Sequence, residues 1–255
     1  MSDKVVRLDE VARYLDDYLC IGEVADERNA LNGLQVGNSG HVRRMAAAVD
    51  ACQASIEAAA QGGADLLLVH HGLFWGGLEP LVGRAYRRVA ALLGHDMALY
   101  SSHVPLDRHP EVGNNAVLAR RLGVDVRGKF GDCCGAPIGV WGELDVPLAG
   151  LCARVESVLG PSVRSIPCGP ERCHRVGIVT GAAQFSIREA HAAGLDTLVT
   201  GEGKHWMFFD AEELGVNVLF AGHYATETLG VQALAARLSE HFGLPWSFVD
   251  HPTGM

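Results

Sequence analysis

Short apolar segments alternate with helical patterns along this chain, and this alternation constrains its fold more than any other feature. The run Leu66–Val69 is apolar at four consecutive positions, which is typical of a strand buried on both faces of a parallel sheet. Further strands are expected at 45–49, 97–101, 175–179, 197–200, 217–221 and 246–249. Helices are expected at 8–19, 50–61, 84–93, 114–122, 148–159, 186–193, 205–214 and 229–241, most of them ended by glycine. The pattern predicts an α/β fold.

The two halves of the chain resemble each other. Each contains an apolar strand, a helix and a second strand, and the second strand is followed by the pattern His-x-x-x-carboxylate. The pattern runs from His103 to Asp107 in the first half and from His223 to Glu227 in the second. We therefore expect two similar α/β lobes, residues 1–130 and 131–255, without an inserted domain. The boundary is approximate, because segments of one lobe could pack within the other.

Charge and composition exclude several classes of protein. The chain of 255 residues carries a formal charge of −9, which argues against direct binding to nucleic acid unless assembly creates a basic surface. No apolar run approaches the roughly 18 residues that span a bilayer, and residues 1–9 lack the apolar core of a signal peptide. Seven scattered cysteines fit reduced thiols. We expect a cytoplasmic protein that does not enter a membrane.

Side chains of the types that bind metals follow three of the expected strands. They are His70, His71, His103, Asp107, His223 and Glu227. In open α/β sheets, ligands bind at the carboxyl ends of the strands, which is where these side chains are expected. Four imidazoles and two carboxylates exceed the three protein ligands of a catalytic zinc and favour two metal ions bridged by a carboxylate. Hydrogen-bonded polar groups that close strand ends are the alternative.

Five motifs resemble the Nif-three-like family of dinuclear metal-centre hexamers, whose bacterial members carry the name GTP cyclohydrolase 1 type 2. They are Asn32-Gly33-Leu34-Gln35-Val36, Val69-His70-His71-Gly72-Leu73-Phe74-Trp75, His103-Val104-Pro105-Leu106-Asp107 with Asn114-Asn115, Thr200-Gly201-Glu202, and Gly222-His223-Tyr224-Ala225-Thr226-Glu227. They follow the family order from near residue 30 to near residue 235. The second and the last are highly specific.

The resemblance implies a metal pair in a cleft between two similar α/β lobes. By this resemblance, His70, Asp107 and Glu227 bind one metal, while His71, His223 and the same Glu227 bind the other. The expected cofactors are two divalent transition-metal ions per chain, and the ligands suit Zn, Mn, Fe, Co or Ni without choosing among them. The resemblance also implies a homohexamer, in which six chains form a toroid as a trimer of dimers.

Four further residues are candidates for the same site. His103 matches a histidine that lines the site in the family, and it is an additional candidate ligand. Glu202, Lys204 and His205 follow the strand that corresponds to the His-His strand. They are candidates for hydrogen bonding to the ligands or for proton transfer, and a solvated helix start is an equal alternative.

These features lead to a functional hypothesis. The chain is expected to be a binuclear metal-dependent hydrolase in which Glu227 bridges the metals and a metal-bound hydroxide attacks the substrate. The substrate would be a small molecule: a nucleotide such as GTP, as the family name implies, or a phosphoester. The alternative is a non-enzymatic metal-binding scaffold or regulatory protein.

Overall fold

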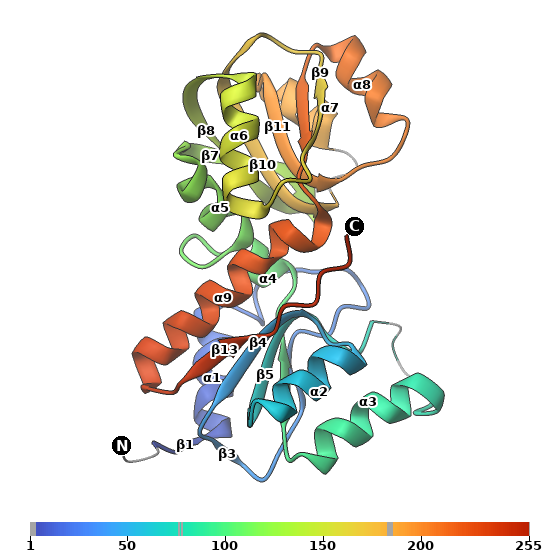
Figure 1. Ribbon diagram of the computed structural model, residues 1–255, viewed down its shortest axis with the longest axis vertical. Coiled ribbons are helices and arrows are strands. Elements are labelled where there is room, and N and C mark those ends of the chain that lie inside the picture. Colours follow the sequence, from blue (N-terminus) through green and yellow to red (C-terminus); the bar gives the residue numbers. More distant parts are fainter. Residues whose placement is uncertain (1–3, 76, 78, 183–185, 255) are drawn as a thin grey trace. The chain divides into compact units, whose positions relative to one another are not determined.

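Strands and helices alternate as the sequence predicts, and the resulting architecture is mixed α/β (Figure 1). The structure is a computed structural model that describes residues 4–75, 77, 79–182 and 186–254. The chain divides into two units. Unit 1 comprises Met1–Leu106 and Val231–His251, and unit 2 comprises Asp107–Gly230 and Pro252–Met255. Residue 130, where the sequence suggested a boundary, lies inside a strand of unit 2.

Unit 1 is centred on a five-stranded sheet. Its strands are β2 (Gly33–Val36), β4 (Met45–Asp50), β5 (Leu66–His71), β6 (Ala98–Ser101) and β13 (Trp246–Phe248). Their order is β13-β4-β5-β6-β2, with β2 antiparallel to β6 and the other neighbours parallel. Two short strands, β1 (Val6–Arg7) and β3 (His41–Val42), pair separately.

Helices cover both faces of the unit 1 sheet. They are α1 (Leu8–Tyr18), α2 (Gln53–Gln61), α3 (Gly83–Gly94) and the part of α9 (His223–Phe242) that follows Gly230. In Figure 1, α2 and α3 lie on the same face. On the other face, the hydroxyl of Tyr100 in β6 donates to Asp16 in α1 at 2.7 Å. The ring of Tyr14 in α1 stacks on His241 in α9, with centroids 4.2 Å apart, so α1 and this part of α9 pack together.

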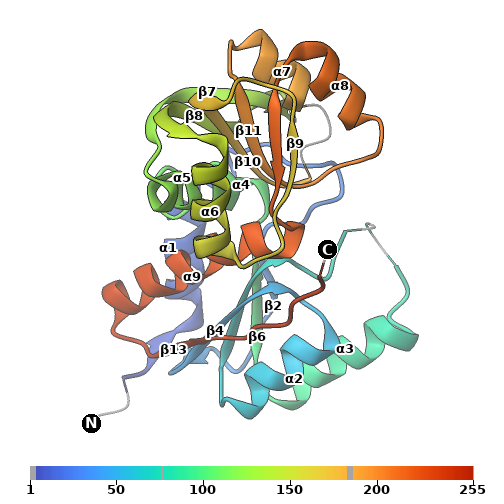
Figure 2. The same ribbon diagram turned by 45° about the horizontal axis from the view of Figure 1, so that its top comes forward.

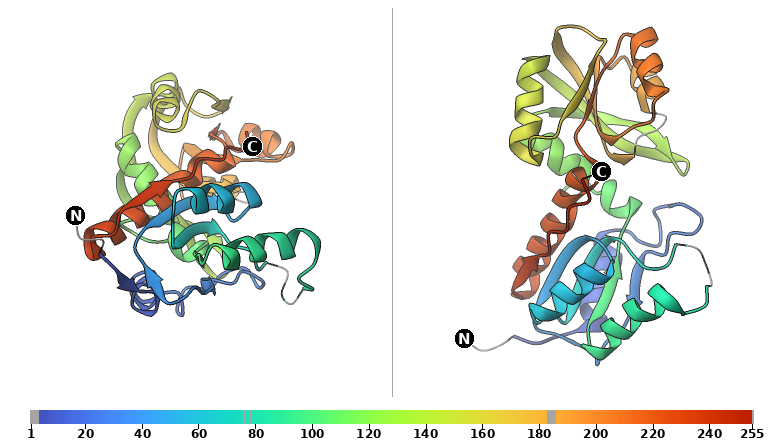
Figure 3. Two further views of the ribbon diagram at one scale, coloured as in Figure 1. Left: turned by 60° about the horizontal axis from the view of Figure 1, so that its bottom comes forward. Right: turned by 45° about the vertical axis from the view of Figure 1, so that its right-hand side comes forward.

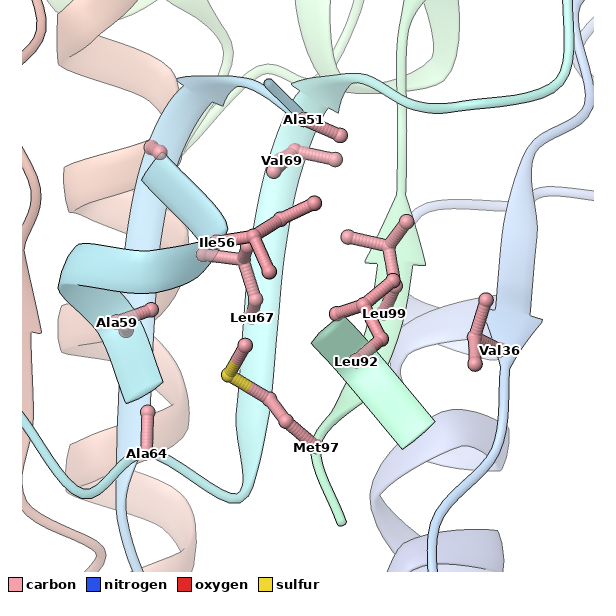
Figure 4. Close-up of a cluster of buried hydrophobic side chains, with 12 residues drawn as sticks. Val36, Ala51, Ile56, Ala59, Ala64, Leu67, Val69, Leu92, Met97 and Leu99 are labelled. Carbon is pink, nitrogen blue, oxygen red and sulfur yellow. The ribbon is translucent and has the colours of Figure 1, made fainter. Parts of the chain in front are cut away.

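The face under α2 and α3 contains a continuous apolar core. Ile56 and Ala59 of α2, and Leu92 of α3, pack against alternate side chains of the central strands (Figure 4). Leu67 of β5 lies in this cluster and is fully buried. Because successive side chains of a strand point to opposite faces, an uninterrupted apolar run such as that of β5 supplies both faces of the sheet at once.

Unit 2 is centred on a six-stranded sheet. Its strands are β7 (Asp125–Cys133), β8 (Ala136–Pro147), β9 (Arg164–Pro167), β10 (Arg172–Ala182), β11 (Thr197–Glu202) and β12 (Asn217–Phe220). Their order is β7-β8-β10-β11-β12-β9, with β10, β11 and β12 parallel to one another. The glycine-rich stretch at 129–147 belongs to the long antiparallel hairpin of β7 and β8.

The helices of unit 2 also lie on both faces of its sheet. They are α5 (Asn114–Leu122), α6 (Leu148–Leu159), α7 (Ser186–Ala192), α8 (Met207–Leu214) and the first part of α9. Figures 2 and 3 show α6 on one face and α8 on the other. Ile187 of α7 and Met207 of α8 share one apolar cluster with Leu198 of β11 and Val218 of β12.

The two sheets share an order of elements. In unit 1 the chain runs β4-α2-β5-α3-β6, and in unit 2 it runs β10-α7-β11-α8-β12. Each set of three parallel strands is completed by an antiparallel edge strand that comes earlier in the chain, β2 beside β6 and β9 beside β12. The similarity between the halves of the sequence is therefore matched by a similar strand pairing.

Several element boundaries differ from the sequence-based predictions. Helix α9 begins at His223 and not near residue 229, so His223 and Glu227 lie on a helix and not in a loop. A four-residue helix, α4 (Val104–Asp107), follows β6. Helix α2 begins at Gln53 because Cys52 and Ser55 exchange hydrogen bonds that cap the helix there. Among the described residues, no helix combines the length and apolar character needed to cross a bilayer.

Candidate metal-binding residues

Unit 1 brings three histidines together at the carboxyl end of its sheet. His70 and His71 are the last residues of β5, which continues two residues beyond the predicted apolar run. Parallel pairing sets Val69 opposite Ser101, so His103 follows β6 close to the end of β5. One ring nitrogen from each of the three histidines lies within 4.8 Å of the others. The sequence predicted these residues at strand ends, and the register of β5 and β6 brings them close together.

Each ring in this group directs Nδ1 to an oxygen atom. The partners are the Ser102 carbonyl for His70 at 2.9 Å, the Asp50 carboxylate for His71 at 2.8 Å, and the Asp26 carboxylate for His103 at 2.9 Å. In a neutral imidazole, a proton on Nδ1 leaves the lone pair on Nε2. Histidines that bind metals through Nε2 are held in this way by an oxygen at the other nitrogen. The three histidines are therefore oriented as metal ligands would be.

Asp26 is fixed by several donors. Its Oδ2 accepts from Asn32 Nδ2 at 2.8 Å and from the Val104 backbone N–H at 3.0 Å, in addition to the His103 contact through Oδ1. Burial alone would raise the pKa of Asp26, but the hydrogen bonds and charge of His103, with the bond from Asn32, lower that pKa to about 2. Asp26 is therefore ionised across the neutral range and can hold the His103 ring.

Unit 2 presents a second group on the first turns of α9. His223 and Glu227 are separated by four residues, which places them on one face of the helix. His223 Nε2 lies 3.1 Å from Glu227 Oε1, while His223 Nδ1 lies 3.1 Å from Glu202 Oε1 at the end of β11. The hydrogen bond to Glu227 is the main cause that raises the pKa of His223 to about 9, against the effect of burial. The pair suits a cation, which would take the place of the proton on Nε2.

A glycine leaves room beside this pair. Gly181 ends the buried part of β10 and has φ +67°, a conformation that favours glycine. A Cβ there would overlap Glu227 Oε1 and approach His223 Nε2. Its N–H donates to Thr226 Oγ1 at 3.0 Å, so this backbone is also fixed to α9. Glu227 is buried, and its carboxylate lies so close to the Gly181 backbone that no side chain would fit at residue 181.

Asp107 is held by two buried asparagines. Asn114 Nδ2 donates to Asp107 Oδ1 at 2.8 Å, and Asn115 Nδ2 donates to the Asp107 carbonyl at 3.2 Å. Asn114 Oδ1 also accepts from the Gly230 N–H of α9 at 2.7 Å. Asn114 thus links the Asp107 carboxylate to the helix that carries Glu227, within the same unit.

The remaining predicted residues lie beside the unit 2 group. Glu202 contacts His223, whereas Lys204 and His205 come after β11 and line a cavity together with Glu202. Sequence reasoning missed Asp26 and Asp50. Asp50 ends β4 beside β5, so the rule that ligands gather at strand ends could have identified it. Asp26 lies outside the strands and helices, and no sequence signal marks it.

Histidine and carboxylate donors of this kind fit divalent transition metals. Imidazole nitrogens with carboxylate oxygens are a usual ligand set for Zn and Fe, and the oriented Nδ1 contacts add the support that such ligands receive in proteins. The fold and these residues together define a class: a mixed α/β protein with histidine and glutamate groups that can hold metal ions.

The chain belongs to the family described as Duf34/NIF3 (NGG1p interacting factor 3), whose model matches residues 6–253. It is 48% identical over 249 residues to a Deinococcus radiodurans protein named GTP cyclohydrolase 1 type 2 homolog, covering 97% of this chain and 94% of that protein. A protein of the same name from Halobacterium salinarum is 46% identical over 254 residues, with 97% and 98% covered.

Solved structures show the same fold. The protein ybgI, described as of unknown function, superposes with a TM-score of 0.91 at 37% identity, covering 98% of this chain and all of the other. A protein from Thermus thermophilus gives a TM-score of 0.86 at 41% identity, with 98% and 100% covered. The family expected from the sequence motifs is thereby confirmed.

Proposed function

We propose that this protein is a binuclear metal-dependent hydrolase. The observation that carries the proposal is the common orientation of four histidines. His70, His71, His103 and His223 each direct Nδ1 to a carbonyl or carboxylate oxygen. A structural role would need no such uniformity, whereas histidines that bind metal through Nε2 almost always have an oxygen partner at Nδ1.

The ligand assignment follows the family resemblance. His70, Asp107 and Glu227 would hold one ion, and His71, His223 and the same Glu227 would hold the other. Two oxygens on one carboxylate allow Glu227 to bridge. His103 is an additional candidate ligand, since it lies with His70 and His71.

The metals would lower the pKa of bound water to near neutrality and polarise the bond that is attacked. This chain's own residues supply the rest. Asp50, Asp26 and Glu202 would keep the imidazoles in the tautomer that leaves Nε2 for the metals. Asn114 would hold the Asp107 carboxylate, because it fixes one of its oxygens through a charge-assisted hydrogen bond.

The substrate proposed is a small anionic molecule. Relatives carry the name GTP cyclohydrolase 1 type 2 homolog, which favours a nucleotide whose ring is opened. A phosphoester is the other candidate, because two-metal sites also catalyse phosphoester hydrolysis.

We also propose that the chain acts in the cytoplasm as a homohexamer, a trimer of dimers. Exposed apolar side chains beside and on α3, among them Val82, Tyr86 and Leu93, support burial against another chain.

The test compares wild type with Glu227→Ala. The control is Glu240→Ala, which removes an exposed carboxylate from the same helix. Wild type and control should contain about two transition-metal ions per chain and hydrolyse GTP or p-nitrophenyl phosphate. Glu227→Ala should lose both properties and remain folded by circular dichroism. Undiminished turnover by metal-free Glu227→Ala would refute the mechanism.

A metal-binding scaffold is the second candidate function. The family description names an interacting factor, and this favours a role in docking other proteins. Metal content without turnover of either substrate class, for every metal restored after chelation, would support the scaffold.

A further inference from the structure

A large cavity opens in unit 2, next to the residue that supports His223. It has a volume of about 800 Å³ and lies where β11 and β12 end. Its lining includes Glu202, which contacts His223 Nδ1, and also Gly222 and Tyr224, the neighbours of His223 in the chain. The cavity therefore begins beside a proposed metal ligand and extends away from it.

Strand pairing places a cation and an aromatic ring on the same wall of this cavity. Arg164 in the edge strand β9 pairs directly with Phe220 in β12. Residues directly opposite in an antiparallel pair project from the same face of the sheet. Phe220 packs against the cluster formed with α7 and α8, so Arg164 also projects from the face covered by α8.

The segment that follows β11 and the first turn of α8 also line the cavity. Lys204, His205 and Phe208 line the cavity there. Within the described part of the chain, neither Arg164 nor Lys204 forms an ion pair, although other arginines near acidic residues in this unit do, for example Arg172 with Asp145. The acidic residue in the lining, Glu202, contacts His223 and, among the described residues, forms no ion pair with either cation, so the two cationic side chains favour an anionic ligand in their part of the cavity.

Two glycines, Gly201 in β11 and Gly203 after it, allow close packing of the backbone beside the cavity. A Cβ on Gly203 would overlap the Phe220 ring and Met207 Sδ, and a Cβ on Gly201 would overlap the Gly181 carbonyl and the backbone of His223. The backbone at Gly203 therefore lies close to the Phe220 ring, and Phe220 and Phe208 both line the cavity. Aromatic side chains of this kind stack on planar ligand rings.

We propose that this cavity is the subsite that binds the phosphate and planar ring of the substrate, with Arg164 and Lys204 as the cations that select a phosphate-bearing molecule. This inference rests on the proposed hydrolase, because it assigns the substrate class of that same site. The phosphate would lie near Arg164 and Lys204, and one face of the ring would lie along Phe220 and Phe208. The bond to be attacked, in the ring or in an ester, would reach past Glu202 towards His223 Nε2, where the metals are proposed. Nucleotides have this combination of an anion and a planar ring.

The test measures binding apart from turnover. Titration calorimetry at low salt compares GMP, guanosine and inorganic pyrophosphate, first with chelator-treated protein and then with metal-loaded protein. GMP and guanosine differ only in the phosphate, so their ratio of affinities reports the cationic subsite. The variants are Arg164→Gln, Lys204→Gln and the pair together. Lys129→Gln is the control, since Lys129 is exposed on β7 outside the cavity.

The proposal expects GMP to bind about a hundredfold more tightly than guanosine, because each of the two contacts to a charged phosphate is worth about one tenfold step. Each Gln variant should lose about one tenfold step of this preference and the double variant all of it, whereas Arg164→Lys should keep more of it than Arg164→Gln. Lys129→Gln should match wild type. Equal affinities for GMP and guanosine in wild type, absence of binding by GMP and pyrophosphate, or unchanged GMP affinity in the folded double variant would each overturn the proposal.

The two proposals fail in different ways. Phosphate-dependent binding in protein that shows no turnover with any metal would overturn the hydrolase and leave the subsite in place. Turnover of GTP with a KM that the double variant does not change would overturn the subsite and leave the hydrolase in place.

Discussion

Removal of the Asp50 carboxylate tests directly whether the oriented histidines serve metal binding. Asp50 Oδ1 lies 2.8 Å from His71 Nδ1, and the two residues are partners in the β4–β5 pairing. The Asp50→Ala substitution leaves the His71 ring in its strand but removes the oxygen that fixes its tautomer and orientation. The backbone carbonyl of Asp50, which accepts from Ser55 Oγ, is kept.

The expected loss is in metal affinity. Removing a carboxylate that supports a ligating histidine weakens metal binding about 10- to 100-fold, which corresponds to about 1.4–2.8 kcal/mol. The Asp50 side chain is 37% exposed, so its removal should change the free energy of unfolding by about 1 kcal/mol or less. The structure thus predicts an effect on metal binding that is larger than the effect on folding.

The assay is competition with a chromophoric chelator at neutral pH, accompanied by urea unfolding of the metal-free protein. Asp65→Ala is the control. Asp65 is a carboxylate of the same unit, but it accepts from the backbone N–H groups of Arg43 and Arg44 and not from a histidine. Asp65→Ala should lose stability and keep its metal affinity. Equal metal affinity in wild type and Asp50→Ala would refute the reasoning.

Three further perturbations test the core, the cavity and the ionised network. Leu67→Ala should lower the free energy of unfolding of unit 1 by about 2–5 kcal/mol in urea, because Leu67 is fully buried in the cluster under α2 and α3; a loss below about 1 kcal/mol would contradict this packing. Gly203→Ala should displace the Phe220 ring and weaken GMP binding several-fold with metal content unchanged, as calorimetry and elemental analysis would show; unchanged GMP affinity would count against the cavity walls. The pKa of Asp26 is lowered from 3.8 to about 2 on folding, so its ionised form stabilises the protein above pH 4, and this contribution disappears as the pH falls to about 2. Wild type should therefore be more stable to urea than Asp26→Asn at pH 6, with a smaller difference at pH 3. A difference that grows in acid would contradict a pKa of Asp26 that is lowered on folding.

The elements that the sequence predicted best are those with purely local signals. The apolar run of β5 and the helix α1, with its apolar positions at helical spacing, occur where they were expected. The start of α9 was predicted six residues late, because the polar residues at its first turns give no apolar period. The edge strand β9 was not predicted, because it is short and its pairing with β12 depends on the fold.

The same division applies to the candidate site. The sequence identified the histidines and carboxylates by type and by position after strands, and motif resemblance identified the family. It identified Lys204 but not Arg164, which comes from an edge strand, and not Asp26, which precedes His103 by 77 residues. Contacts between residues this far apart depend on which strands pair and in what register.

The sequence by itself determined the α/β alternation and the chemical identity of the donors, because apolar runs, glycine stops and side-chain types are local properties of the chain. Only the tertiary structure decided the partner of each histidine Nδ1 and the residues that share a cavity. Asp50 meets His71 through the register of β4 and β5, and Arg164 shares a wall with Phe220 through the register of β9 and β12. Register is fixed by the burial of whole sheet faces, and that is a property of the folded chain as a whole.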